Sequence, residues 1–225
     1  MTRVAIISAL PGELKPLVDG WPHSTRNGVQ FWGQRSEAEE WIAACAGAGQ
    51  QAATRAFAAI EEGGPIDLVF SVGWAGALRE GLTAGTAHNV AAVIDIRTGE
   101  RFSCDAGAGE LLLATSPRVA DEAEKLRLAA TYSAAMVDME AAAIGRLAAM
   151  RGIPFYCIKG ISDGLTDRLP DFNRFLSLDG KFKLARFILF ALFRPLYWPA
   201  LIRMRDNSNR ASLGISRLLL DFLDE

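Results

Sequence analysis

Residues 136–163 read MVDMEAAAIGRLAAMRGIPFYCIKGISD, and this stretch decides the fold. Met136–Met139 and Phe155–Gly160 are short apolar runs of the length and composition of buried strands. Between them, Glu140–Arg151 consists of good helix formers. A strand, a helix and a second strand in succession predict a crossover connection and a parallel arrangement of the two strands.

The same alternation extends toward the N-terminus. Further apolar runs predict strands at Val4–Leu10, Trp41–Ala46, Leu68–Val72, Ala87–Ile96 and Leu111–Ala114. An alanine-rich stretch at 51–62 and the charge spacing of 117–128 predict helices, and a glycine-rich turn is expected at 73–76. The fold class is therefore α/β, with three α/β/α layers around a mixed, mostly parallel sheet.

The C-terminal part of the chain has a different character. From about Leu169 onward apolar and basic residues mix, and Pro195 and Pro199 interrupt the pattern. We therefore expect one α/β domain at residues 1–178, followed by an amphipathic, basic and apolar appendage at residues 179–225.

Composition excludes several classes of protein. The chain has 225 residues, of which 50% are hydrophobic, which suffices for one sizeable core. A net charge of −2 does not fit a nucleic-acid-binding protein. Three cysteines without metal or redox spacing, and a start without signal-peptide pattern, predict a cytoplasmic protein. Because His23 and His88 are isolated, no metal or redox cofactor is expected.

Three carboxylates follow directly on predicted strands. Glu13 follows the first strand, Glu140 follows Met136–Met139, and Asp163 follows the strand that ends at Gly160. Since ligands of open parallel sheets bind beyond the carboxyl ends of the strands, these side chains are expected to share a cleft. Each also has a simpler explanation, because carboxylates are common in first helical turns and in tight turns.

The same positions carry a family resemblance. Five segments resemble 5′-methylthioadenosine/S-adenosylhomocysteine nucleosidases and the wider nucleoside phosphorylase superfamily, namely Val4–Leu14, Gly47–Ala53, Gly73–Leu78 with its continuation Gly81–Thr86, Val137–Ala143 and Ile161–Asp163. The resemblance implies that Glu140 holds the ribose hydroxyls, that Met139 packs on the sugar, and that Asp163 binds a purine and protonates its N7. It implies that Glu13 activates water. Five further residues would contact substrate: Ser162, Gly73, Trp74, Ala75 and Gly76.

These residue types suit the cleavage of a glycosidic bond. A purine leaves poorly as an anion, and protonation by a carboxylic acid typically accelerates such a step by about 10²–10⁴. Carboxylates also stabilise the cation-like ribose that remains. Phosphorylases of the superfamily typically have an arginine where Ser71 stands and a small serine where Trp74 stands. Hydrolysis is therefore favoured over phosphorolysis.

The segment Lys181–Arg205 reads KFKLARFILFALFRPLYWPALIRMR, with six basic residues and no acid. Its apolar part, Phe187–Phe193, is far shorter than the ~20 residues of a membrane-spanning helix. Aromatic and basic residues together are typical of a segment that lies in a membrane interface. The alternatives are a buried helix with a basic surface, or a dimer contact.

Four dipeptides of this region narrow the resemblance to hopanoid-associated phosphorylases: Leu169-Pro170, Asp179-Gly180, Arg194-Pro195 and Asn207-Ser208. The chain departs from that subfamily at Ala77, where a second glycine is usual, and at Lys159-Gly160, where an arginine is expected nearby. The resemblance implies hydrolysis of adenosylhopane to release adenine, by a homodimer peripheral to the inner membrane face. The alternatives are a methylthioadenosine/adenosylhomocysteine nucleosidase, a purine nucleoside phosphorylase, and a nucleoside-binding protein without activity that docks on membranes.

Overall fold

The computed structural model describes residues 1–105, 110–167, 169–177 and 180–223. The strands are β1 (Thr2–Ser8), β2 (His23–Arg26), β3 (Val29–Arg35), β4 (Glu39–Cys45), β5 (Leu68–Ala77), β6 (Ala87–Asn89), β7 (Ala92–Asp95), β8 (Arg101–Ser103), β9 (Leu112–Thr115), β10 (Met136–Asp138) and β11 (Phe155–Asp163). The helices are α1 (Pro11–Val18), α2 (Gln50–Glu61), α3 (Glu122–Tyr132), α4 (Ala141–Arg151), α5 (Leu184–Leu192) and α6 (Trp198–Leu223), with short 3₁₀ helices η1 (Phe172–Phe175) and η2 (Pro195–Tyr197).

The strands form one mixed sheet, as the sequence predicts. Parallel pairs lie at its centre, where β1 joins β4 to β5 and β5 continues to β11. Antiparallel pairs lie toward the edges, in β2–β3 and β7–β8. The long strand β5 pairs with β10 through its last residues, Gly76 and Ala77, so that the ends of β5, β10 and β11 come together.

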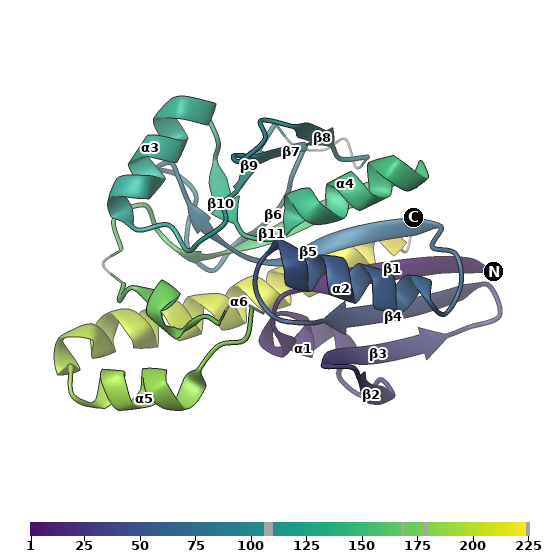
Figure 1. Cartoon of the computed structure of the whole chain (residues 1–225), viewed down its shortest axis with the longest axis horizontal. Coiled ribbons are helices and arrows are strands. Elements are labelled where there is room, and N and C mark those ends of the chain that lie inside the picture. The colour runs from purple at the N-terminus through teal and green to yellow at the C-terminus, as the bar shows by residue number, and fades with distance from the viewer. Residues whose placement is uncertain (106–109, 168, 178–179, 224–225) are drawn as a thin grey trace.

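Helices cover both faces of this sheet, which gives the three expected layers (Figure 1). Ala5 and Ile7 of β1 pack in one core with α2 and α4, while Val4 and Ile6 pack in a second core with α1 and α6. Side chains alternate between the faces because successive residues of a strand point to opposite sides.

Several predicted elements differ from the observed ones. The expected strand Ala87–Ile96 is two strands, because β6 pairs with β11 and β7 pairs with β9. The expected turn at 73–76 is a continuous part of β5. The helix expected at 117–128 begins only at Glu122, after the Asp121 carboxylate accepts a hydrogen bond from the Glu124 N–H and caps it.

The C-terminal segment divides into two parts with different surroundings. The second half of α6 belongs to the main body, since Ala211, Ile215 and Leu219 are buried and the helix packs along β11. A Cβ atom on Gly160 would lie only 2.7 Å from that of Ala211, so glycine permits this close packing. The expected boundary between residues 178 and 179 lies outside the described residues.

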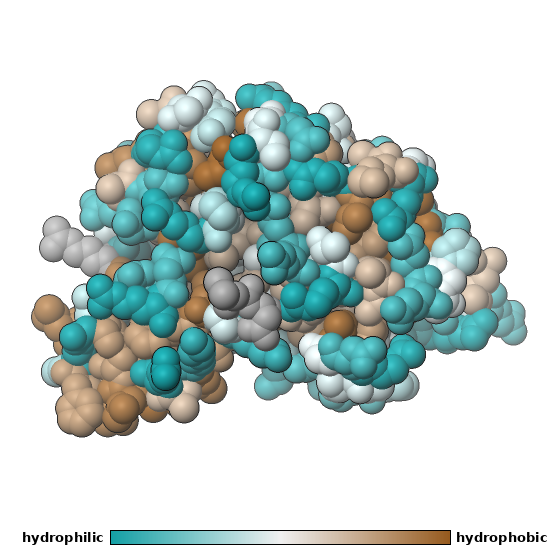
Figure 2. All heavy atoms as spheres, viewed as in Figure 1, coloured by the Kyte–Doolittle hydropathy of each residue, from teal (hydrophilic) through white to brown (hydrophobic). Residues whose placement is uncertain are grey.

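The other part, α5, η2 and the start of α6, extends beyond the body at one end (Figure 1). None of the residues of α5 is buried. Figure 2 shows a hydrophobic surface gathered over this end of the molecule. No single helix among the described residues is long and apolar enough to span a membrane, but α5 and the segment Pro195–Phe222 reach that length and composition together, with a bend of 104° between them.

Candidate active site

A cavity of about 570 Å³ opens where β1, β5, β10 and β11 end. Eight of the nine predicted site residues line it: Glu13, Glu140, Asp163, Met139, Ser162, Trp74, Ala75 and Gly76. The ninth, Gly73, lies behind Glu13, and a Cβ atom there would be 2.9 Å from Glu13 Oε1. Gly73 is therefore needed to give the carboxylate room.

Glu13 lies in the first turn of α1, directly after β1, and its carboxylate is buried. Oε2 accepts hydrogen bonds from the N–H groups of Ala9 and Leu10, both at 2.8 Å, and Oε1 accepts one from Trp74 N–H at 2.8 Å. Burial raises the pKa of Glu13, against the opposing effect of these three donors. The residue thus caps a helix and also presents a carboxylate to the cavity.

Glu140 is the N-cap residue of α4 and follows β10. Its Oε1 accepts a hydrogen bond of 2.5 Å from Gly49 N–H, and its Oε2 accepts one of 3.1 Å from Met139 N–H. Burial, with a smaller contribution from the negative charge of Asp138, raises the pKa of Glu140 to about 8. Burial therefore favours the protonated form of Glu140.

A buried ion pair beneath these two carboxylates is a feature that the sequence analysis missed. Lys159 Nζ lies 2.9 Å from Asp138 Oδ2 and 3.2 Å from Ser71 Oγ. Burial is the largest single effect on the pKa of Lys159 and lowers it, but the charges of Asp138, Cys157 and Glu140 together outweigh burial and raise the pKa above its ordinary value. The positive charge of Lys159 in turn acts on both Glu13 and Glu140 and favours their ionised forms.

Asp163 ends β11 and reaches the cavity through an irregularity in the sheet. The pairing of β11 with β5 shifts register between Ile161 and Asp163, and such bulges re-aim side chains near sites. Asp163 Oδ1 accepts a hydrogen bond of 2.5 Å from Ser162 Oγ, and Oδ2 forms an ion pair with Lys125 of α3. Lys125 was not predicted as a site residue.

Trp74 joins the cavity to the C-terminal helix. Its indole N–H lies 2.9 Å from Ser212 Oγ and 3.1 Å from Ser208 O of α6. Its ring lies against Gly12, where a Cβ atom would be 3.2 Å away. The indole therefore occupies space beside Glu13 while it fixes the position of α6.

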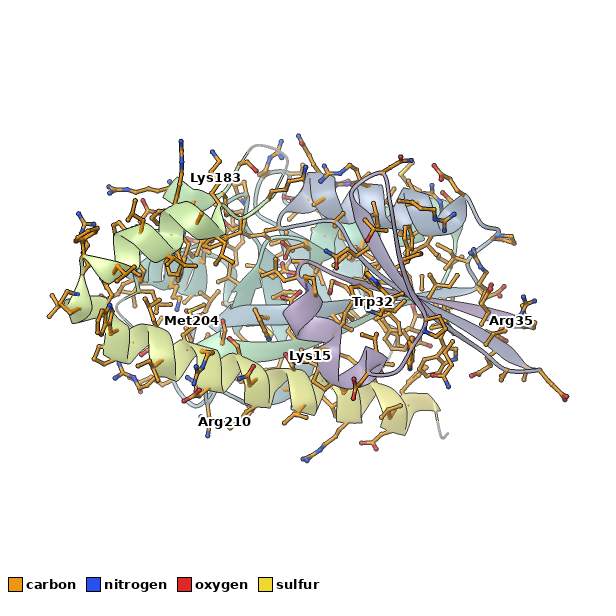
Figure 3. All side chains as sticks on the ribbon, turned by 90° about the horizontal axis from the view of Figure 1, so that it is seen from below. Lys15, Trp32, Arg35, Lys183, Met204 and Arg210 are labelled. Atoms are coloured by element: carbon orange, nitrogen blue, oxygen red, sulfur yellow. The ribbon has the colours of Figure 1, made fainter. Side chains whose placement is uncertain are left out.

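The far side of the cavity is apolar and comes from the C-terminal segment. Its apolar lining residues on η1, α5, α6 and the turns between them are Phe172, Leu176, Phe182, Leu184, Phe187, Leu201 and Met204. The next residues of α6 that line the cavity are polar, namely Arg205, Ser208 and Asn209. In Figure 3, Met204 lies on the side of α6 that faces α5, whereas Arg210 lies on the opposite side. From its sequence, this segment is expected outside the α/β domain and is not among the predicted site residues.

A backbone contact anchors this segment to the polar side of the cavity. Ala48 N–H donates a hydrogen bond of 2.8 Å to Gly180 O, beside the turn that holds Glu140. A Cβ atom on Gly180 would collide with Ala48 O, so only glycine fits there. The cavity thus combines carboxylates at the strand ends with an apolar wall. Among the described residues, no group of three or more His, Cys, Asp or Glu side chains is placed to hold a metal ion.

Comparisons with known proteins agree with this fold. The sequence model of the Phosphorylase superfamily matches residues 98–185. No curated protein sequence matches the chain. Among solved structures, the 5′-methylthioadenosine/S-adenosylhomocysteine nucleosidase of Helicobacter pylori with butyl-thio-DADMe-Immucillin-A is similar, with a TM-score of 0.74, 15% identity, and coverage of 100% of this chain and 98% of that one.

Two further structures are similar over the same extent. The S-adenosylhomocysteine nucleosidase of Streptococcus pyogenes in complex with 5-methylthiotubericidin has a TM-score of 0.74, 18% identity, and coverage of 99% and 96%. The futalosine hydrolase of Helicobacter pylori has a TM-score of 0.75, 14% identity, and coverage of 99% and 97%. At these identities the likeness establishes the fold, which is that of nucleoside phosphorylases and nucleosidases.

Proposed function

We propose that the protein hydrolyses the N-glycosidic bond of a purine nucleoside. The observation that carries this proposal is the convergence of three buried carboxylates, Glu13, Glu140 and Asp163, in one cavity at the strand ends. They come from three separate parts of the chain, and each is held by specific hydrogen bonds. The fold and the match to the Phosphorylase superfamily support the same reaction class.

The geometry suggests a role for each carboxylate. Asp163 would bind the base and pass it a proton, while Glu140 would accept hydrogen bonds from the ribose hydroxyls. Glu13, which is fixed by three backbone N–H groups, would accept a proton from the attacking water. Glu13, and Glu140 in its ionised form, would also stabilise the positive charge that develops on the ribose as the bond breaks.

Hydrolysis, rather than phosphorolysis, is supported by the surroundings of Ser71 and Trp74. Ser71 is fully buried and accepts a hydrogen bond from Lys159, so it is not directed at a ligand. Trp74 lies in the same strand, β5, and its indole N–H is bound by Ser212 Oγ of α6. An attacking phosphate would need space and cationic donors at this place, whereas a water molecule needs only Glu13.

The apolar wall supports a substrate with a large apolar substituent on the sugar. Methylthioribose and homocysteine substituents are small or polar, whereas seven apolar side chains line this part of the cavity. Together with the resemblance of the C-terminal dipeptides to hopanoid-associated phosphorylases, this favours an adenine nucleoside of a lipid, with adenosylhopane as the leading substrate. Soluble thio-nucleosides are the alternative.

The exposed apolar end of the molecule supports a peripheral contact with an anionic membrane. Leu196 and Phe193 are 90% and 80% exposed, and most of the large exposed hydrophobic residues of the described chain lie at 184–202. Basic residues flank them, including Lys181, Lys183 and Arg205. A lipid nucleoside could then enter the cavity directly from the bilayer surface.

We further propose that the protein is a homodimer located on the cytoplasmic face of the membrane. Analytical ultracentrifugation tests the dimer, and cell fractionation tests the location.

A panel of nucleosides tests the proposed substrate. Base release is measured from adenosylhopane in detergent, methylthioadenosine, adenosylhomocysteine and inosine, each with and without phosphate. Release of adenine from adenosylhopane without phosphate is expected. Release only from the thio-nucleosides would overturn the lipid substrate and keep hydrolysis, and a requirement for phosphate would make the protein a phosphorylase. No release from any nucleoside would favour a binding protein.

A further inference from the structure

Lys125 is a buried lysine in the cavity that the proposed mechanism does not yet use. It is 3% exposed, although lysine is seldom fully buried unless it is paired. Its Nζ forms the ion pair with Asp163 Oδ2 and donates a hydrogen bond of 2.5 Å to Gly164 O. Among the described residues, Lys125 and Ser162 are the side chains that bind the Asp163 carboxylate.

Lys125 is the fourth residue of α3, near the positive end of the helix dipole. The acidic residues of the same turn, Asp121, Glu122 and Glu124, offset that dipole. The sheet also leaves space for the pair, since a Cβ atom on Gly76 would be 3.1 Å from Lys125 Cε and 3.3 Å from Asp163 Oδ2. The absence of a side chain at Gly76 therefore permits the buried contact between Lys125 and Asp163.

This contact bears on the source of the proton. To protonate the departing base, Asp163 has to be a carboxylic acid at the moment of transfer. An ammonium group is a weaker acid than a carboxylic acid, so in a pair that shares one proton the proton rests mainly on nitrogen. The proton that the reaction requires is therefore stored on Lys125, next to the oxygen that has to deliver it.

We infer that Lys125 supplies the proton that Asp163 passes to the leaving base, an inference that rests on the proposed nucleoside hydrolysis. As the bond between the anomeric carbon and the base nitrogen breaks, its electron pair moves to the base. The Lys125 ammonium passes its proton to the Asp163 carboxylate as Asp163 passes it on to a ring nitrogen, so that Asp163 is again a carboxylate and Lys125 a neutral amine. The solvent then restores the ammonium with a proton, and Glu13 releases to the solvent the proton that it took from the attacking water. Lys125 is thus a positioning residue, because it acts through Asp163.

The competing explanation is that the pair only ties α3 to β11. The two explanations are distinguished by comparing a substrate whose leaving group needs a proton with one whose leaving group does not. A purine needs protonation in order to leave, whereas 4-nitrophenolate is a stable anion that leaves without it. The full chain is therefore assayed on the nucleoside that the wild type accepts, and on the 4-nitrophenyl riboside with the same 5′ substituent. Lys125→Met keeps the apolar length of the side chain, and circular dichroism checks that the variant is folded.

If Lys125 supplies the proton, Lys125→Met should lose far more activity on the nucleoside than on the nitrophenyl riboside. Lys125→Met should lower kcat on the nucleoside by about 10²–10⁴, as expected for loss of acid catalysis, and lower kcat on the nitrophenyl riboside less than threefold. Equal losses on the two substrates, or no loss on the nucleoside, would overturn it. If the wild type releases no base from any nucleoside while binding it, the proposed hydrolysis fails, and that result is distinct from a failure of the role of Lys125 alone.

Chemical rescue provides a second measurement in case Lys125→Met does not fold. Lys125→Ala leaves room for a small cation beside Asp163. Methylammonium can give up a proton, while tetramethylammonium carries the same charge and cannot. Rescue of base release by methylammonium only is expected. Equal rescue by both cations would show that charge alone is needed and would contradict the inference.

Discussion

At the scale of single residues, the proposed chemistry depends on three carboxylates at the cavity and on two buried lysines, Lys125 and Lys159. Glu13, Glu140 and Asp163 follow strands, and the structure places all three in one cavity. Lys125 has the appearance of an ordinary helical surface lysine in sequence, because its burial depends on contacts with β11 and Gly76. The burial of Lys159 was predictable, because it lies inside an apolar strand. A buried lysine needs a partner of opposite charge, which is Asp138.

Asp163→Asn should abolish base release while the protein remains folded. The amide cannot donate a carboxylic proton to the base, so we expect a loss of at least about 10² in kcat. The change also leaves Lys125 buried without its counter-charge, which costs ~3–5 kcal/mol of unfolding free energy. Base release by chromatography and urea unfolding measure both effects.

The double variant Asp163→Asn/Lys125→Met is the control for stability. It removes both charges, so it should recover part of the lost unfolding free energy and remain inactive. Full activity in Asp163→Asn would exclude Asp163 as the proton donor.

The pKa of Glu140 predicts how stability depends on pH. Because its value in the folded protein is about 8, against 4.5 for the unperturbed group, the folded state holds this proton more tightly. The stabilisation from Glu140 is complete below about pH 4.5 and is lost as the pH rises through about 8. Between these values the group contributes a slope of up to ~1.4 kcal/mol per pH unit.

Glu140→Gln should therefore flatten the decline of unfolding free energy between pH 5 and 8, as measured by urea titration at several pH values. Some decline should remain, since the raised pKa of Glu13 acts in the same direction. The exposed Glu37→Gln serves as the matched control and should keep the wild-type slope. An unchanged slope in Glu140→Gln would show that Glu140 is ionised throughout this range.

At the scale of elements, the strands that were predicted wrongly are those whose limits depend on pairing with other strands. The hairpin β2–β3 was missed, although Asn27-Gly28 is a strong hairpin signal and both residues have positive φ angles. The segment Ala87–Ile96 has the composition of one strand, but its two ends pair with different partners, β11 and β9. Which neighbouring strand a segment pairs with depends on the tertiary structure, so local composition does not predict it.

The packing of α6 on β11 gives a prediction at this scale. Gly160→Ala places a Cβ atom 2.7 Å from that of Ala211, which has to move together with its helix. We expect a loss of ~1–3 kcal/mol in unfolding free energy, as for other overpacked cores. Gly33→Ala in β3 is the control, because its nearest neighbour would be at 3.8 Å, and it should change the unfolding free energy by less than ~0.5 kcal/mol. Equal stability of the two variants would mean that α6 is free to shift.

At the scale of the whole molecule, the C-terminal segment lines the cavity and also presents an exposed apolar surface. It was expected as an appendage, and its basic and apolar composition was recognised. Its contribution to the cavity wall could not be predicted, because that depends on how α5 folds back over α6 and on the contact between Gly180 and Ala48.

Replacing exposed apolar residues at this end should weaken membrane binding. The double variant Phe193→Ser/Leu196→Ser removes two of the most exposed apolar side chains, and we expect at least a tenfold loss in binding to phosphatidylglycerol vesicles by co-sedimentation. Met150→Ser on α4 is the control, since Met150 is 74% exposed but lies on the main body. Wild-type binding should also weaken with salt. Equal vesicle binding by the double variant would contradict an interface role for this segment.

The central claim, hydrolysis at the strand-end carboxylates, is tested most directly by the sugar product. The wild-type protein is incubated in phosphate buffer with the nucleoside that it accepts, and the sugar is identified by mass spectrometry. Hydrolysis predicts a free sugar with a hydroxyl group at the anomeric carbon, formed at the same rate with and without phosphate. A sugar 1-phosphate as the product would contradict the account.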